Sequence, residues 1–294
     1  MEIITEEKRE ENLEQAGFAW RERGALRALV CAPMEREGFT NGFSTRTGGA
    51  SPMPQDALNL AGFQDDRAEN IHENRRRFLS LFEGEWTLAA CWQVHGAEVR
   101  AIKDAEDALC DTERCDALTT GAQNVLLAVK TADCVPVLLA DTRNQAMAAI
   151  HAGWRGTLAR VVEATLRQMT TLYGTHPSDV RAAIGPSAGT CCYEVGSEVI
   201  EGFRREFKDA DELLTPTGRD GHALIDLPRA NRGQLTRAGV AHARIHLAPL
   251  CTICRNDLFF SYRREKHLHG RVGRSLSVIG RATMNEAGAV GRKQ

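Results

Sequence analysis

Three short apolar segments near the middle of the chain limit its possible folds more than any other feature of the sequence. The segments are NVLLAVKT from Asn124, VPVLLAD from Val135 and QAMAAIH from Gln145, and turn-forming residues separate them. Segments of this length with β-branched residues are typical of buried strands, and the second and third can pair as a hairpin. A helical pattern of apolar residues follows over 157–173, so we expect strands and then a helix that covers them.

Other segments add helices, strands and loops to this prediction. Glycine, proline, asparagine and serine crowd residues 38–59, which favours loops. Apolar spacing predicts helices over 65–82, 196–207 and 226–238, the last with Asp226 as its N-cap. Short apolar segments predict strands in DVRAAIG, LFFSYRRE and RSLSVIG. The predicted fold class is a mixed α/β sandwich, a single domain in which helices cover sheets.

Charge and composition describe one domain with a charged arm. We predict an N-terminal arm over residues 1–19 and a single domain over residues 20–294, because no repeat or linker interrupts the latter. The N-terminus lacks the basic start and apolar stretch of a secretory signal, which favours a cytoplasmic location. A formal net charge of -2 with both signs interspersed indicates neither a nucleic-acid nor a membrane partner, and the basic run at 75–77 fits a solvated helix face.

Nine cysteines in a chain kept reduced argue against a disulfide framework and leave buried thiols, metal ligands or a nucleophile as their roles. The pair Cys251 and Cys254, with His267 or His269 behind it, has the C-x-x-C spacing that can hold zinc or act in redox chemistry. A second C-x-x-C at zinc-finger spacing and a thioredoxin-like surrounding are both missing. We therefore expect the pair to have a structural or incidental role.

A second cysteine cluster lies at Cys191 and Cys192, after the turn-forming Gly-Pro-Ser at 185–187. Neighbouring side chains on a strand point to opposite faces, so at most one of the two thiols would face a site. The following Tyr193 and Glu194 fit packing roles.

Three other residues have the chemistry of a zinc site. His95 lies in CWQVHGAEV, Cys134 lies between two apolar segments, and His151 ends the segment QAMAAIH. Taken singly, His95 is typical of a hydrogen-bonded structural histidine and Cys134 of a buried small side chain. If the three strands are neighbours in one sheet, however, Cys134 and His151 meet at one edge. Two imidazoles and a thiolate would give zinc three ligands and leave a fourth position for water or substrate, as in catalytic sites.

The segment after His151, AGWRG, joins a strand to a helix through two glycines. Backbone N–H groups at such a junction can bind an anion, and Arg155 can add a charged contact. The segment therefore predicts a site for a phosphate-type group.

Taken together, the motifs of this chain resemble those of the laccase-domain (YfiH-type) family. Members of that family are described variously as polyphenol oxidases, as purine nucleoside phosphorylases with adenosine deaminase activity, and as peptidoglycan editing factors. The matching motifs, in order along residues 38–280, are GFSTRTGG, LNL, QVHG, TADCVPVLLAD, HAGWRGT, IGP, CYEVG, C-T-x-C and FFSYRR.

The resemblance implies a laccase-type catalytic domain with zinc bound by His95, Cys134 and His151. It also implies phosphorolysis of adenosine, inosine and methylthioadenosine to base and pentose 1-phosphate, with deamination of adenosine as a second activity. The partners would then be a small nucleoside and phosphate. By the same resemblance, Arg46 and Asn59 are expected near the substrate, and the general acid and base remain unassigned.

Three alternative functions stay open. A copper polyphenol oxidase would need many more closely spaced histidines than the nine that are scattered along this chain, so copper is less favoured than zinc. A cell-wall precursor editing hydrolase would use Cys134 as a nucleophile and a histidine as its base. A non-enzymatic module would hold zinc in a closed, four-ligand site.

Overall fold

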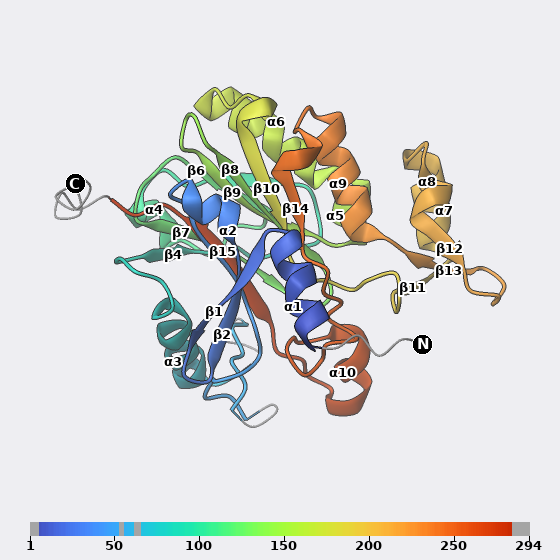
Figure 1. Cartoon of the computed structure of the whole chain (residues 1–294), viewed down its shortest axis with the longest axis horizontal. Coiled ribbons are helices and arrows are strands. Elements are labelled where there is room, and N and C mark those ends of the chain that lie inside the picture. Colours follow the sequence, from blue (N-terminus) through green and yellow to red (C-terminus); the bar gives the residue numbers. More distant parts are fainter. Residues whose placement is uncertain (1–5, 53–55, 62–65, 284–294) are drawn as a thin grey trace.

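Two six-stranded sheets lie face to face at the centre of the computed structural model, which describes residues 6–52, 56–61 and 66–283 (Figure 1). In spatial order, the first sheet contains β1 (Phe18–Arg23), β2 (Leu26–Cys31), β3 (Thr40–Ser44), β15 (Ser275–Gly280), β7 (Val125–Thr131) and β4 (Thr87–Ala89). The second contains β14 (Ile245–Leu247), β10 (Val180–Ile184), β8 (Val135–Asp141), β9 (Met147–Ala152), β6 (Ala117–Thr120) and β5 (Val99–Ala101).

The alternation of side chains along the strands builds the core between these sheets. On β7, Leu127 and Val129 point inward to the core that also holds Leu138 of β8 and Met147 of β9. Leu126 and Ala128, which alternate with these two residues along the strand, belong to a separate core on the outer face of the first sheet. Both faces of β7 are therefore buried, which explains its continuous apolar sequence.

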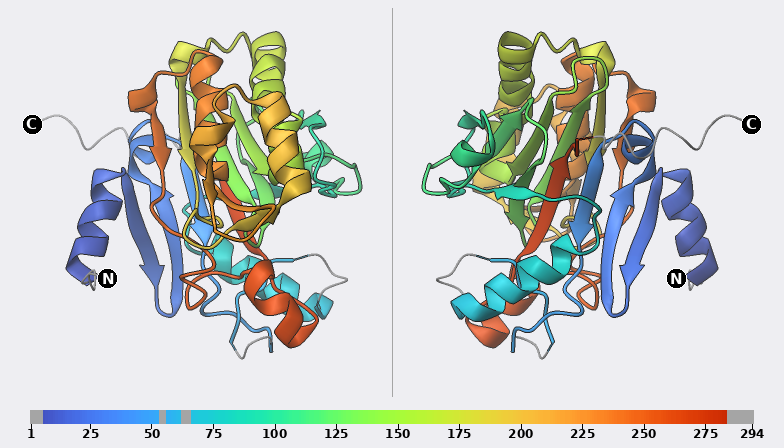
Figure 2. Two further views of the ribbon diagram at one scale, coloured as in Figure 1. Left: turned by 90° about the vertical axis from the view of Figure 1, so that its right-hand side faces the viewer. Right: turned by 90° about the vertical axis from the view of Figure 1, so that its left-hand side faces the viewer.

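Helices cover the outer faces of the two sheets, so the predicted sandwich is confirmed (Figure 2). On the second sheet, α6 packs with Val162, Leu166 and Met169 in the core that this sheet shares with its helices. On the first sheet, Phe78 of α3 does the same. The helix bounds are α1 Glu6–Gln15, α2 Ala32–Arg36, α3 Ala68–Leu79, α4 Ala105–Ala108, α5 Trp154–Leu158, α6 Val161–Tyr173, α7 Ser197–Glu206, α8 Ala210–Leu213, α9 Leu227–Arg237 and α10 Tyr262–His269.

A third, small sheet lies beside α7 and α8 and contains β11 (Glu194–Gly196), β13 (His222–Ile225) and β12 (Leu214–Pro216) (Figure 1). The predictions of helices near 196–207 and 226–238 are confirmed by α7 and α9. The side chain of Asp226 accepts a hydrogen bond from the backbone N–H of Arg229, so the predicted N-cap is also confirmed.

The predicted hairpin is confirmed as well, since β8 and β9 pair in antiparallel fashion with Pro136 opposite His151. The expectation that all three central strands share one sheet is wrong. β7 lies in the first sheet, and residues 132–134 carry the chain across to β8 in the second. Apolar content alone shows that a strand is buried on both faces but does not show which sheet contains it.

The helix predicted over 157–173 is two helices, α5 and α6. Arg160 between them has a φ of 59°, a left-handed conformation that ends the first helix. The predicted strand in LFFSYRRE is also wrong, because α10 begins within it. Ser261 caps that helix by accepting a hydrogen bond from the backbone N–H of Arg264, while the buried Phe259 and Phe260 precede it.

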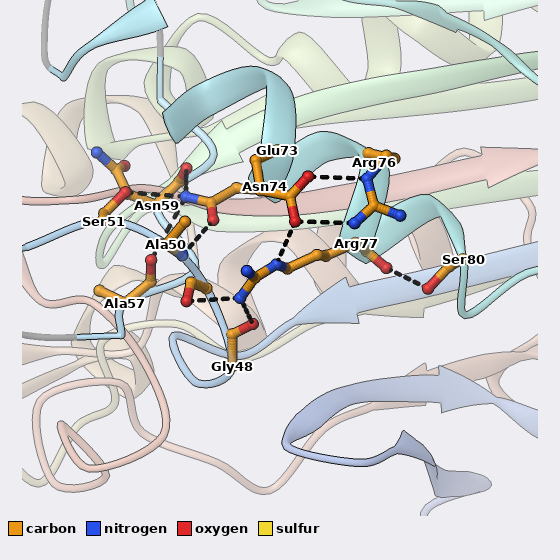
Figure 3. A network of polar contacts seen from close by, with 11 residues as sticks. Gly48, Ala50, Ser51, Ala57, Asn59, Glu73, Asn74, Arg76, Arg77 and Ser80 are labelled. Carbon is orange, nitrogen blue, oxygen red and sulfur yellow. Dashed lines mark hydrogen bonds and ion pairs between the residues drawn. The ribbon is translucent and has the colours of Figure 1, made fainter. Parts of the chain in front are cut away.

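The glycine-rich segment over 38–59 contains β3 and then a loop that is tied to α3 (Figure 3). The buried Asn74 accepts a hydrogen bond from the backbone N–H of Ala50 and donates to the side chain of Ser51 and the carbonyl of Asn59. On the same helix, Arg76 and Arg77 both pair with Glu73, in keeping with the solvated basic run.

In the N-terminal region, α1 precedes β1, and Leu13 and Phe18 are both buried in the core between the sheets. The boundary between arm and domain at 19 and 20 stays a prediction. Among the described helices, none combines the length and the apolar composition that a bilayer crossing requires.

Candidate metal centre

The structure brings His95, Cys134 and His151 together, with their potential ligand atoms all within 4.8 Å of one another. His95 lies in the loop before β5, Cys134 in the turn between β7 and β8, and His151 on β9. The two imidazole rings lie 4.8 Å apart, centre to centre, at an angle of 79°. His151 is buried, Cys134 is half-buried and His95 is exposed. The group therefore opens to the surface on the His95 side and has the composition of a metal site.

Asp116, fully buried at the start of β6, organises two of these three residues. Its Oδ1 lies 2.7 Å from Nδ1 of His151. Its two oxygens also accept hydrogen bonds from the backbone N–H groups of Val94, His95 and Gly96, at 3.2, 2.9 and 2.6 Å. Because Asp116 engages Nδ1 of His151, Nε2 is left as the ligand atom of that ring.

His95 lies in a loop and has a φ of 60°. Gln93, two residues earlier, fixes this loop to β7. Its side-chain amide donates to the carbonyl of Lys130 and accepts from the N–H of the same residue, both at 2.7 Å. Gln93 and Asp116 thus hold the two ends of the short QVHG segment.

Cys134 owes its position to the preceding residue, Asp133, whose φ of 89° turns the chain from one sheet to the other. The buried carboxylate of Asp133 accepts hydrogen bonds from Oγ1 of Thr252 at 2.7 Å, from Oγ of Ser261 at 3.0 Å and from the N–H of Arg263 at 2.7 Å. These bonds hold a non-glycine residue in a conformation that costs free energy.

The glycines of HAGWRG allow close approach to the metal-ligand group. A Cβ on Gly153 would lie 3.1 Å from the sulfur of Cys134 and 3.1 Å from Cδ2 of His95. A Cβ on Gly156 would lie 2.9 Å from the carbonyl oxygen of Gly96. Both glycines therefore have a steric reason to be present, apart from any contact with an anion.

The charges of the group stabilise one another in the absence of a metal. Burial by itself would raise the pKa of the Cys134 thiol, but the charge of His151 and hydrogen bonds from His151 and His95 lower it to about 6. Burial would lower the pKa of His151, but the Cys134 thiolate and the Asp116 carboxylate raise it to about 9. Burial opposes the ionisation of Asp116, yet hydrogen bonds from His151 and Gly96 keep its pKa below the usual range. Thiolate, imidazolium and carboxylate therefore coexist near neutral pH.

The residues predicted to contact substrate have different surroundings. The buried Arg46 is paired with Glu265 at 2.7 Å, and Oδ1 of the buried Asn59 accepts backbone hydrogen bonds. By contrast, the side chain of Arg155 is 58% exposed; its guanidinium lies over the ring of Trp154 and 3.7 Å from Glu198. Arg155 is two residues along the chain from Gly153, the glycine that approaches Cys134 and His95. A substrate contact by any of the three stays a prediction.

Sequence analysis singled out neither Asp116 nor Arg263 as a member of this region, and it gave Tyr193 a packing role. The charges of Cys134, Arg263 and Arg155 all act on the half-buried Tyr193, whose pKa is raised to about 12 chiefly by burial. The guanidinium of Arg263 lies 5.1 Å from the centre of the Tyr193 ring. No local pattern marks Asp116, because a single aspartate before a strand has no periodic signature.

The sequence of this chain is similar to known proteins over the region that contains the ligand group. The family described as multi-copper polyphenol oxidoreductase laccase matches residues 40–282, which include all three members of the ligand group. The chain belongs to this laccase-domain family. Its curated relatives include "Purine nucleoside phosphorylase YlmD" of Geobacillus stearothermophilus, 34% identical, with 90% of this chain and 97% of the relative covered. "Purine nucleoside phosphorylase YfiH" of Escherichia coli is 35% identical, with 80% and 91% covered.

Solved structures of laccase-domain proteins have the same fold. The crystal structure of YlmD from Geobacillus stearothermophilus aligns with a TM-score of 0.81 at 32% identity and covers 90% of this chain and 99% of that chain. A Bacillus licheniformis protein titled hypothetical protein YfiH also aligns with a TM-score of 0.81, at 30% identity, with 90% and 98% covered. The laccase-domain fold of this chain is thus shown over nearly its whole length, and its His-Cys-His group can bind a metal.

Proposed function

We propose that this laccase-domain protein is a zinc-dependent purine nucleoside phosphorylase. The observation that carries the proposal is the open group of His95, Cys134 and His151, which offers three ligand atoms within 4.8 Å of one another and is exposed at His95. Several relatives that match most of the chain are named purine nucleoside phosphorylases, which supports the same activity here. The substrates would be a small purine nucleoside, such as adenosine, inosine or methylthioadenosine, and phosphate.

The donor set fits zinc. Imidazole nitrogen and thiolate sulfur are both ligand types that zinc takes, three protein ligands are the number found in catalytic zinc sites, and the lowered pKa of Cys134, about 6, supplies the thiolate near neutral pH. Asp116 would orient His151, as carboxylates commonly do for metal-bound histidines. When bound, zinc supplies Lewis-acid polarisation of a substrate oxygen. Copper is named in the family's description and is the metal to exclude by analysis.

The chain's own residues would bind the phosphate. Arg155 and Arg263 are both exposed, and the charges of both act on Tyr193, as does the charge of Cys134. The two guanidinium groups can therefore contribute positive charge to the binding of a phosphate near the ligand group. In the proposed reaction a phosphate oxygen forms a bond to C1′ of the pentose. The N-glycosidic bond breaks, and its electron pair leaves with the base, which takes up a proton. The products are the free base and pentose 1-phosphate.

Deamination of adenosine is proposed as a second activity of the same site. In that reaction the oxygen of water becomes bonded to C6 of the purine and the amino group leaves as ammonia, so inosine is formed. A cytoplasmic location is also proposed, because all nine cysteines are free thiols, which suits a reducing compartment.

The test is chromatography of the products formed from adenosine and from inosine, with and without phosphate. We expect base and pentose 1-phosphate only when phosphate is present. Cys134→Ser should lower the rate more than about 100-fold, since loss of an outer partner of a metal ligand can alone cost that much. Cys110→Ser, which changes an exposed cysteine outside the ligand group, is the matched control and should keep full activity. Equal release of base without phosphate would contradict phosphorolysis.

One observation favours a second candidate, an editing hydrolase for a cell-wall precursor. Cys134 would be the nucleophile and His151 its base, since the two lie in one group. Asp116 would be the carboxylate that orients the base, since it contacts Nδ1 of His151. In that case the free thiolate of Cys134 would attack an amide carbonyl, and the C–N bond would break as His151 gives a proton to the departing amine. Water would then hydrolyse the thioester and restore the thiolate. The two candidates differ in metal content, because a thiolate bound to zinc is a poor free nucleophile. A metal-free protein that turns over amides would favour the hydrolase.

A further inference from the structure

Four other cysteines converge at a second place in the molecule. The sulfurs of Cys191, Cys192, Cys251 and Cys254 all lie within 4.8 Å of one another, and we call them the four-cysteine cluster. Two come from the turn before β11, and two from the turn that follows β14. None of them belongs to the group formed by His95, Cys134 and His151.

The backbone of the first turn explains how two adjacent cysteines can face the same point. The carbonyl of Gly189 accepts hydrogen bonds from the N–H groups of Cys192 and Tyr193, at 3.0 and 2.9 Å, so the segment is a tight turn. Strand alternation does not apply to a turn. The expectation that at most one of the two thiols faces a site is therefore wrong: the sulfurs of Cys191 and Cys192 each lie 3.3 Å from that of Cys254.

The two turns are joined to each other by backbone contacts that do not involve the sulfurs. Ser187 pairs with Cys251 in a parallel bridge, and its carbonyl accepts from the N–H of Thr252 at 3.0 Å. The polypeptide therefore holds the four thiols close together by itself.

Gly189 allows the two turns of the cluster to approach each other closely. Its N–H donates to the sulfur of Cys251 at 3.3 Å, as a backbone group does for a thiolate. A Cβ on Gly189 would lie 3.2 Å from the Cβ of Cys251 and 3.5 Å from the sulfurs of Cys191 and Cys251. A larger residue here would crowd the turns apart.

We propose that the four-cysteine cluster is a second metal site that binds one zinc ion in a structural role. In a tetrahedral Cys₄ zinc site with bonds of about 2.3 Å, the sulfurs are separated by roughly 3.8 Å. Here the sulfur of Cys254 lies 3.3 Å from those of Cys191 and Cys192, and all four sulfurs lie within 4.8 Å of one another, so small shifts of the two turns would give that spacing. Four soft thiolates close the coordination shell and leave no position for substrate, which distinguishes this cluster from the open three-ligand group.

The position of the cluster would let a bound zinc ion stabilise the surroundings of Asp133. Ala188, which precedes Gly189, donates its N–H to the carbonyl of Asp133 at 2.9 Å. Thr252, which follows Cys251, donates its hydroxyl to the carboxylate of Asp133 at 2.7 Å. Zinc in the cluster would therefore brace both of the turns that hold Asp133, the residue whose backbone turns Cys134 toward its partners.

The experiment is metal analysis of the full-length reduced protein after loading with zinc and desalting. We expect about two zinc ions per chain in the wild type, one for each site. The double variant Cys251→Ser, Cys254→Ser should lose one equivalent, Cys134→Ser should lose the other, and Cys110→Ser should keep both. Equal zinc content in the wild type and the double variant would overturn the inference. This outcome would leave the proposed phosphorylase function untouched, because that function rests on the other site.

A measurement on the wild type guards against variants that fail to fold. Zinc-loaded protein is treated with iodoacetamide, and the alkylated cysteines are identified by peptide mass spectrometry. We expect the four cysteines of the cluster to be protected, including the exposed Cys191 and Cys254, and to react once a chelator has removed the zinc. The exposed Cys110 should react under both conditions. Rapid alkylation of the cluster in the loaded protein, or a disulfide within it, would overturn the proposal.

Discussion

Oδ1 of Asp116 lies 2.7 Å from Nδ1 of His151, while the same carboxylate accepts three backbone hydrogen bonds from residues 94–96. One buried side chain therefore sets the orientation of His151 and the backbone course at His95. His95 and His151, which lie far apart in the sequence, are thereby held in place as two of the three ligand residues of a preformed site.

Replacement of Asp116 by asparagine should weaken metal binding without unfolding the protein. The amide keeps the size of the carboxylate but loses its charge and offers fewer acceptor sites to Val94, His95 and Gly96. We expect the affinity for zinc to fall about 10- to 100-fold, measured by competition with a chromogenic chelator. Asp211→Asn, which changes an exposed carboxylate, is the control. Unchanged affinity in the Asp116 variant would contradict the role assigned to this residue.

The reactivity of Cys134 in the metal-free protein should depend on pH in a specific way. Its lowered pKa of about 6 means that the thiolate persists until the pH falls through that value. The rate of alkylation by iodoacetamide should therefore stay level from about pH 8 to 7 and fall below about pH 6, whereas an ordinary thiol loses reactivity below about 8.5. Quantitative mass spectrometry of the peptide that contains Cys134 would measure the rate. A midpoint near 8.5 would contradict the ion pair with His151.

Gly153→Ala should impair the site through steric contact alone. The new Cβ would lie 3.1 Å from the sulfur of Cys134 and from the ring of His95, so one of these groups must move. We expect zinc affinity to fall on the order of 10-fold and stability to fall by about 1 to 3 kcal/mol. Metal titration and urea unfolding measure the two effects. Gly196→Ala, at a position with open space around its Cβ, should leave the zinc affinity unchanged.

Asp133→Ala should destabilise the fold, because the carboxylate of Asp133 is a buried hydrogen-bond acceptor. The substitution leaves the hydroxyls of Thr252 and Ser261 and the N–H of Arg263 without their buried acceptor. We expect the free energy of unfolding in urea to fall by about 3 kcal/mol. Asp209→Ala, at an aspartate whose side chain is 43% exposed, should cost much less. A loss of equal size in both variants would show that Asp133 does not clamp the turn.

The sequence predicts those parts of the fold that local patterns determine. The hairpin of β8 and β9 follows from two apolar segments on either side of Asp141–Asn144, and the start of α9 follows from its N-cap at Asp226. The motif strings also predict the meeting of Cys134 and His151. Local patterns cannot show that β7 enters the opposite sheet, because that depends on a turn at Asp133 held by residues more than 100 positions away.

The roles of Asp116 and of the four-cysteine cluster also escape local patterns. A single aspartate before a strand has no periodic signature, and its partners become apparent only when His95 and His151 are seen together. Likewise, C-x-x-C beside an adjacent pair of cysteines has none of the spacing of a zinc finger. The parallel bridge between Ser187 and Cys251 brings the two pairs together.

The central claim is that a metal held by His95, Cys134 and His151 supports phosphorolysis. The most direct measurement is the rate at which base is released from inosine in phosphate buffer while zinc is withdrawn by a chelator and then returned. We expect the rate to fall to background when zinc is withdrawn and to recover with zinc in the wild type but not in Cys134→Ser. Full activity in the metal-free wild type, or recovery with copper and not with zinc, would contradict the central claim.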